Sequence, residues 1–175
     1  VNTIEKPCMI AVGRDSYRNF DILDDVTREL GWRLILVTQS YLVTDKLRTN
    51  PNIMILDNIS YDELFSLYRA AEVAIVPLKR CTTHMSGIRA TIEAMLQGTN
   101  VIASRSPGMN EYFEDRIDLL YYEPENKDDL IEKIKLISQN REYKYKLAQN
   151  YSEKVKKSFN VEQYADSLEE ILSAI

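Results

Sequence analysis

The strongest constraint on the fold is a set of six short runs that are apolar at nearly every position instead of at alternate positions. A strand with alternating residues keeps one face in water, whereas a strand that is apolar throughout is covered on both faces, as in a parallel sheet. The runs occupy residues 9–12, 34–37, 53–56, 73–76, 101–103 and 119–122. They predict a mostly parallel sheet of about six strands.

The segments between these runs carry apolar residues at helical spacing, as Leu23, Val26 and Leu30 illustrate. Residues typical of helix boundaries accompany them. Those that mark helix starts are Ser60 with Glu63, and Asn126, and those that mark helix ends are Gly31 and Gly98. Strands alternating with helices predict βαβ units with right-handed crossovers. Residues 40–52 fit the pattern less well, and we expect a short strand or an irregular link there.

After Pro124 the pattern becomes entirely helical. Three apolar stripes follow, which are Leu130, Ile134 and Ile137, then Tyr143, Leu147, Tyr151 and Val155, then Val161, Tyr164, Ala165, Leu168, Ile171, Leu172 and Ile175, with Asn160 and Gln163 as a capping pair. No internal repeat or linker interrupts the chain. We therefore expect residues 1–175 to form a single α/β domain, Rossmann-like and three-layered, with a helical C-terminal tail. A flavodoxin-like or receiver domain is the alternative, but such folds usually end with one helix after the last strand.

Composition excludes several classes of protein. Lysine and arginine total 22 against 27 aspartates and glutamates, and the net charge of −5 argues against nucleic-acid binding. Two cysteines and one histidine are too few for a disulfide framework or a multi-histidine metal site. No apolar run reaches the ~18 residues of a membrane-spanning helix, and no signal peptide precedes the first strand. We expect a cytoplasmic protein, and Val1 at the start favours a piece of a longer chain, with processing as the alternative.

Ligands of open α/β sheets bind beyond the carboxyl ends of the strands, so the loops that follow the strands hold the candidate site residues. The loops after the first, fourth and fifth expected strands are rich in cations, which are Arg14, Arg18, Lys79, Arg80 and Arg105. An acidic protein that gathers cations at this edge is expected to bind an anion. The alternative is that these side chains are simply solvated.

The segment Ser86–Gly87–Ile88 opens a helix at the same edge, where free amides and the helix dipole suit a phosphate. Gly87 removes a side chain where a ligand would approach the backbone. Glu93 follows two turns later, roughly 10 Å along the helix axis at 1.5 Å per residue. A carboxylate there can accept hydrogen bonds from ribose hydroxyls beside a bound diphosphate.

These residues carry a family resemblance. The stretch 86–104, which contains Glu93-Ala94-Met95, then Gly98, then Val101-Ile102-Ala103, resembles the signature of family 4 glycosyltransferases of the GT-B fold. The neighbouring segments are similar in the same order. They are Gly13-Arg14 with Arg18-Asn19-Phe20, the stretch from Asn52 to Leu64, Pro107-Gly108 with Glu111, and the final helices. The resemblance covers nearly the whole chain but only the C-terminal, donor-binding half of that family.

The resemblance implies a role for each residue of the candidate site. Arg14 and Arg18 would neutralise the diphosphate of a nucleotide-sugar in place of a metal ion. The amides of Gly87, Ile88 and Arg89, beside Ser86, would hold phosphate or sugar oxygens. Glu93 would bind the ribose, and the backbone around residues 56–59 would contact the base. No catalytic residue, metal ion or further cofactor is assigned.

The implied activity is transfer of a sugar, with retention of configuration, from a nucleotide-sugar donor to a glycan or lipid-linked acceptor, as in surface polysaccharide synthesis. The acceptor-binding N-terminal domain is expected to be missing, so this chain alone would bind nucleotide weakly and transfer nothing. The face of Ile171, Leu172 and Ile175 would then lack the domain it packs against, and a membrane surface would be reached only through the full-length protein.

The sequence departs from the family at two places. The family has a glutamate eight positions before the one matched by Glu93, and Met85 stands there. The family's usual lysine after the first strand is replaced by Arg18, which keeps the charge. Met85 favours an alternative function, that of a nucleotide-binding or interaction module that kept the fold and lost the chemistry.

Overall fold

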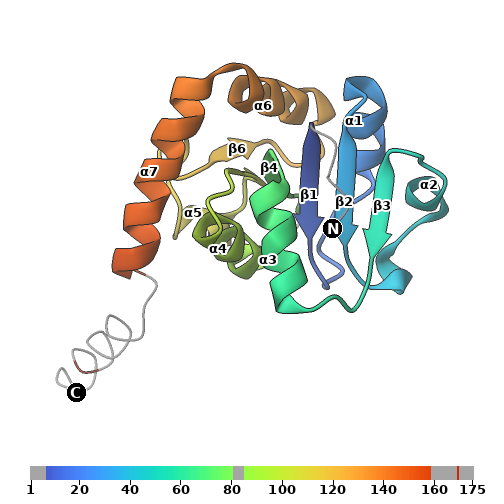
Figure 1. The fold of residues 1–175 in the computed structure, drawn as a ribbon, viewed down its shortest axis with the longest axis horizontal. Coiled ribbons are helices and arrows are strands. Elements are labelled where there is room, and N and C mark those ends of the chain that lie inside the picture. The colour runs from blue at the N-terminus through green and yellow to red at the C-terminus, as the bar shows by residue number, and fades with distance from the viewer. Residues whose placement is uncertain (1–6, 81–84, 159–168, 170–175) are drawn as a thin grey trace.

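The computed structural model describes residues 7–80, 85–158 and 169, and it contains one six-stranded parallel sheet (Figure 1). The strand order is β3-β2-β1-β4-β5-β6, and all neighbours run parallel. The strands are β1 (Cys8–Val12), β2 (Arg33–Val37), β3 (Ile53–Leu56), β4 (Val73–Val76), β5 (Val101–Ser104) and β6 (Leu120–Tyr122). Every strand predicted from an apolar run is confirmed, with ends that differ by at most one residue.

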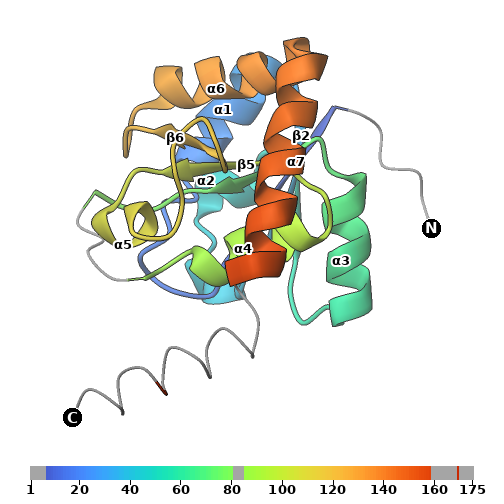
Figure 2. The ribbon, with the colours of Figure 1, turned by 90° about the vertical axis from the view of Figure 1, so that its left-hand side faces the viewer.

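Helices cover both faces of this sheet. They are α1 (Ile22–Leu30), α2 (Asp45–Arg48), α3 (Tyr61–Ala70), α4 (Ile88–Leu96), α5 (Pro107–Asn110), α6 (Lys127–Gln139) and α7 (Arg141–Ser158), with a 3₁₀ turn at Ser40–Leu42. Figure 2 shows α1 and α6 on one face and α3 and α4 on the other. The predicted three-layer α/β architecture is therefore confirmed.

Alternate residues of each strand enter two separate cores. On β1, Met9 and Ala11 join the core beneath α1 and α6, whereas Cys8 and Ile10 join the core beneath α3 and α4. Burial on both faces explains why the strands are apolar at every position. Burial also raises the pKa of the Cys8 thiol to about 11, so this cysteine is an inert core residue.

The predicted helical tail is confirmed for its first two stripes. α6 buries Leu130, Ile134 and Ile137, and α7 buries Leu147, Tyr151 and Val155. The expected third stripe, which includes Ile171, Leu172 and Ile175, lies outside the described residues. Within the described part of the chain, no helix combines the length and the apolar character needed to cross a membrane.

Predicted helix boundaries also agree with the structure. Ser60 and Glu63 form a reciprocal capping box at the start of α3, and the Asn126 side chain accepts from the Asp129 amide at the start of α6. Gly31 and Gly98 adopt the left-handed conformation just after α1 and α4, with φ of 65° and 78°. These local rules hold because each depends on one or two residues near in sequence.

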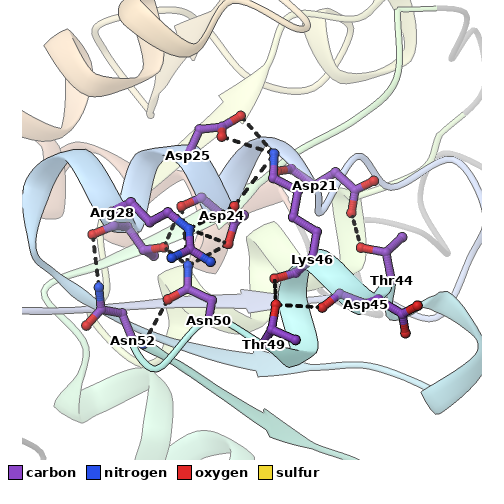
Figure 3. Close-up of polar contacts among 11 residues, drawn as sticks. Asp21, Asp24, Asp25, Arg28, Thr44, Asp45, Lys46, Thr49, Asn50 and Asn52 are labelled. Atoms are coloured by element: carbon purple, nitrogen blue, oxygen red, sulfur yellow. Dashed lines mark hydrogen bonds and ion pairs between the residues drawn. The ribbon is translucent and has the colours of Figure 1, made fainter.

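The expectation of a short strand or irregular link at 40–52 is wrong, because this segment forms the 3₁₀ turn and α2. Leu47 is completely buried in the core beneath α1. Polar contacts join this segment to residues of α1 that lie more than twenty positions earlier in the sequence (Figure 3). Asn50 donates to the Asp24 carboxylate at 2.6 Å and to the Thr27 hydroxyl at 2.9 Å.

Asp24 is the centre of these contacts and is itself buried. Arg28 donates to it from the next turn of α1, and the Lys46 ammonium lies 3.7 Å away. Burial opposes ionisation of Asp24, but hydrogen bonds from Arg28 and Asn50 outweigh that effect and lower its pKa. The buried carboxylate therefore stabilises the fold in its charged form.

We expect Asp24→Asn to reduce the free energy of unfolding by about 1–3 kcal/mol at pH 7, because charge-assisted hydrogen bonds are lost inside the protein. The folded pKa of Asp24 is lowered, so its contribution is present above the unfolded pKa of about 3.9 and is lost as the pH falls through the folded value. In urea unfolding, the difference in the free energy of unfolding between the two proteins should accordingly be smaller at about pH 3 than at pH 7.

Asp25→Asn is the matched control, because Asp25 is half exposed and contacts the same Lys46 at 3.0 Å. An exposed pair of this kind contributes roughly 0–1 kcal/mol. Equal losses in the two variants would contradict the central role of Asp24.

Candidate functional site: a cavity at the entrance of α4

A cavity of about 390 Å³ lies beyond the carboxyl ends of β1 and β2 and against the first two turns of α4. It is lined by the end of β1 and the loop after it, by the β3–α3 connection and by α4. The lining residues are Val12, Gly13, Arg14, Asp15, Arg18, Val37, Ile59, Tyr61, Leu64, Met85, Ser86, Gly87, Arg89, Ala90 and Glu93. This is the edge of the sheet at which a ligand was expected.

Six of the seven predicted site residues line this one cavity, namely Arg14, Arg18, Ser86, Gly87, Arg89 and Glu93. Ile88 does not line it. Its side chain is half-buried against the core beneath α3 and α4. Only the backbone amide of Ile88 therefore stays a candidate ligand contact.

Arg18 is buried beneath the loop that follows β1. A side chain at Gly13 would place its Cβ 2.5 Å from the Arg18 Nε, so glycine at position 13 leaves room for the guanidinium. Burial lowers the pKa of Arg18, and the neighbouring Asp15 partly offsets the effect. The Nη1 atom is buried and has no hydrogen-bond partner among the described residues. A buried guanidinium nitrogen without an acceptor is costly, and Arg18 is also one of the residues that line the cavity.

Asp15 connects the loop to the entrance of α4. Its Oδ2 accepts from Arg18 Nε at 3.1 Å, and its Oδ1 accepts from the Ser86 hydroxyl at 3.0 Å and from the Tyr17 amide at 3.1 Å. Asp15 was not predicted as a site residue. Its bond to an amide two residues later is a common local feature of aspartate in turns, but its contact with Ser86 spans 71 residues.

Gly87 is the N-cap of α4, so the predicted start of a helix at Ser86–Gly87–Ile88 is confirmed, and packing within the protein accounts for the glycine. Its φ is 95°, a conformation that costs other residues energy. An added Cβ would lie 2.7 Å from Val76 Cγ1 and 3.6 Å from Arg18 Nη1. Glycine thus lets the entrance of α4 lie against β4 and places its first amides beside the arginine.

Glu93 lies at the other end of the cavity and is largely buried. Arg89 donates from Nε to its Oε1 at 2.8 Å, and this hydrogen bond raises the pKa of Arg89. Arg89 also donates to the hydroxyl of Tyr61, whose ring centroid lies 5.7 Å from the guanidinium carbon. Tyr61 is half exposed and was not predicted as a site residue, because an aromatic residue in a helix first turn carries no signal of its own.

The five cations lie in loops at one edge of the sheet, as expected, but three of them do not line the cavity. Arg80 donates to the Pro124 carbonyl, and Arg105 donates to the carboxylates of Asp115 and Glu123. Lys79 does not line the cavity either. The loops after β4 and β5 share the edge of the sheet with the β1 loop, but Arg80 and Arg105 contact the segments on either side of β6.

Two further expectations concern the contact with the nucleotide base and the residues that could bind a metal ion. Of residues 56–59, expected near a base, Ile59 lines the cavity. The single histidine, His84, and one of the two cysteines, Cys81, lie outside the described residues. Across the described ranges, no three or more His, Cys, Asp or Glu side chains are grouped so that they could hold a metal ion.

We expect Gly87→Ala to destabilise the protein by at least about 1 kcal/mol more than Gly98→Ala, because overpacking adds to backbone strain. Both glycines have positive φ, but nothing lies within 4 Å of a Cβ added at Gly98. The strain alone costs roughly 1–2 kcal/mol. Urea unfolding of both variants measures the difference, and equal losses would mean that the contact with Val76 relaxes.

The chain is similar to a known protein family. Residues 38–158 match the family described as "Glycosyl transferases group 1". The loop that contains Arg14 and Arg18 lies outside the matched range, before α1 and β2. No curated protein matches the chain.

Solved structures share the fold. Sucrose-phosphate synthase from Thermosynechococcus elongatus has a TM-score of 0.78 at 23% identity, covering 97% of this chain and 46% of its own. Anabaena HepE, solved in complex with UDP, has a TM-score of 0.78 at 17% identity, covering 96% and 49%. The C-terminal domain of the group 1 transferase LpcC from Francisella tularensis has a TM-score of 0.68 at 18% identity, covering 89% and 87%.

The chain thus spans less than half the length of the first two proteins and most of the isolated C-terminal domain of the third. The predicted half of a GT-B fold is confirmed. The chain belongs to the group 1 family of glycosyltransferases and has the fold of their C-terminal domain.

Proposed function

We propose that the cavity at the entrance of α4 binds the diphosphate of a nucleotide-sugar, and that the chain is the donor-binding domain of a retaining glycosyltransferase. The observation that carries the proposal is the Nη1 atom of Arg18. It is buried beside Gly87 and lacks an acceptor among the described residues. An anionic oxygen at this point would satisfy it with a charge-assisted hydrogen bond.

Other donors of the cavity fit the same ligand. The first amides of α4 have no acceptors within the helix, and the helix dipole favours an anion in front of them. Arg14 also lines the cavity and, unlike the buried Arg18, is exposed. Together these groups would neutralise a diphosphate without a metal ion, and we assign no further cofactor.

Glu93 suits the nucleoside end of the ligand. It lies two turns beyond Ser86 on the cavity side of α4, roughly 10 Å along the axis. One carboxylate oxygen is held by Arg89, which orients the group to accept from ribose hydroxyls. The base would then lie near Ile59 and Tyr61. The UDP bound to HepE, a protein of the same fold, supports a nucleotide ligand.

In the proposed reaction the bond from the anomeric carbon of the donor sugar to the diphosphate oxygen breaks, and the diphosphate leaves with the electron pair. The acceptor hydroxyl oxygen forms the new bond to the anomeric carbon, and its proton is released. Arg14, Arg18 and the α4 amides stabilise the charge that develops on it. The part of the protein that corresponds to the other half of the relatives would bind the acceptor, a glycan or a lipid-linked glycan in surface polysaccharide synthesis in the cytoplasm. The 175-residue chain alone would bind nucleotide weakly and transfer nothing.

Met85 favours a second candidate function, that of a nucleotide-binding module without catalytic activity. It lines the cavity where the related transferases carry a glutamate, and its Sδ accepts from the Tyr112 hydroxyl at 3.0 Å. A thioether cannot replace a carboxylate that accepts hydrogen bonds from sugar hydroxyls. Donor hydrolysis by the longer protein, before and after Met85→Glu, separates the two functions, since activity that appears only in the variant identifies a binding module.

Titration calorimetry with UDP, GDP and ADP tests the proposed site. We expect one of them to bind, and Arg14→Ala to weaken it on the order of tenfold through the loss of a charged hydrogen-bond donor. Arg141→Ala is the control, because Arg141 is exposed at the start of α7 and does not line the cavity. Absence of binding to all three nucleotides at millimolar concentration, or equal effects of the two variants, would refute the proposal.

A further inference from the structure

We propose that Asp15 makes the site discriminate against the nucleoside diphosphate product in favour of the nucleotide-sugar donor. The inference rests on the proposed function and adds to it a residue that sets specificity. Asp15 is the acidic lining residue that lies among the groups assigned to the diphosphate. It contacts both Arg18 and Ser86 and keeps 40% of its side chain exposed.

The position of Asp15 identifies the part of the ligand that it faces. Its Oδ1 is bonded to Ser86, which stands just before the first residue of α4. Glu93, which we assign to the ribose, lies two turns away at the far end of the cavity. Asp15 therefore faces the end where the second phosphate lies, and with it the sugar when a donor is bound.

Asp15 also divides the Arg18 guanidinium between two tasks. The Nε atom is bonded to the Asp15 carboxylate, whereas Nη1 is buried beside Gly87 without a partner in the described ranges. The pair is formally neutral. Arg18 thus offers a directed donor to the ligand while Asp15 removes most of the net positive charge that a lone arginine would present.

Donor and product differ in charge at this end. In the donor the second phosphate is esterified to the sugar and carries one negative charge. Transfer breaks the bond from the anomeric carbon to the phosphate oxygen, the acceptor hydroxyl loses its proton, and the terminal phosphate gains a second ionisable oxygen. A terminal phosphate carries about −1.5 to −2 at pH 7. A nearby carboxylate repels this product more strongly than the donor and so favours its release.

The ratio of two dissociation constants measures this discrimination. We compare UDP with UDP-glucose on the 175-residue chain, or the GDP or ADP pair if that base is the one bound. Asp15→Asn should shift the ratio toward the diphosphate on the order of tenfold at pH 7.5, through removal of one charge. The shift should shrink at about pH 5.5, where the terminal phosphate loses its second charge.

Asp128→Asn is the control, because it makes the same change in net charge at an exposed carboxylate on α6. It should leave the ratio unchanged. Damage to the structure of the site would weaken the binding of both ligands to the same extent, so the ratio of the two dissociation constants would not change. Asp15→Ser provides the same comparison if Asp15→Asn fails to fold.

The outcomes are distinct from those that test the proposed function. If the unmodified chain binds neither ligand, the proposed function is wrong and this inference falls with it. If the unmodified chain binds but both Asp15 variants leave the ratio within about twofold, or shift it toward the nucleotide-sugar, Asp15 does not discriminate by charge.

Discussion

The cavity depends on one buried cation. Arg18 lies beneath Gly13 and beside Gly87, and a side chain at Gly13 would collide with it, whereas one at Gly87 would collide with Val76. Burying a guanidinium is costly unless it is paired, and Asp15 provides the pairing on one edge of the group. Because Asp15 is bonded to Ser86 as well, the same carboxylate connects the loop after β1 to the entrance of α4. The geometry of the site is thus a consequence of how this single charge is accommodated.

Local rules in the sequence predicted most of the fold, because a strand covered on both faces leaves an uninterrupted apolar run and a capped helix leaves a capping residue. The failure at residues 40–52 has a physical cause. That segment is stabilised by bonds from Asn50 and Lys46 to Asp24 and Asp25 on α1. These contacts join residues more than twenty positions apart, so the spacing of apolar residues along the sequence does not predict them.

The candidate site, like the fold, has features that the sequence could predict and others that depend on distant contacts. Arg14, Ser86, Gly87 and Glu93 could be predicted because the carboxyl ends of parallel strands share an edge and a motif marks the α4 entrance. Arg80 and Arg105 lie at the same edge but do not line the cavity, since position at that edge does not reveal which carboxylates lie nearby. Those carboxylates come from residues around β6, such as Asp115 and Glu123 for Arg105.

The charges of the cavity follow a common arrangement. Arg18 is paired with Asp15 at one end and Arg89 with Glu93 at the other, so each arginine is oriented by an acid without adding net charge. Arg14 has no carboxylate within ion-pair distance in the part of the chain that the structure describes. The side chains that line the cavity therefore carry a net charge of about +1. Such a cavity would hold an anionic ligand more through directed hydrogen bonds than through a strong electrostatic field. Such a site favours correct placement of an anionic ligand over tight retention, which agrees with the proposed release of a nucleoside diphosphate after each transfer.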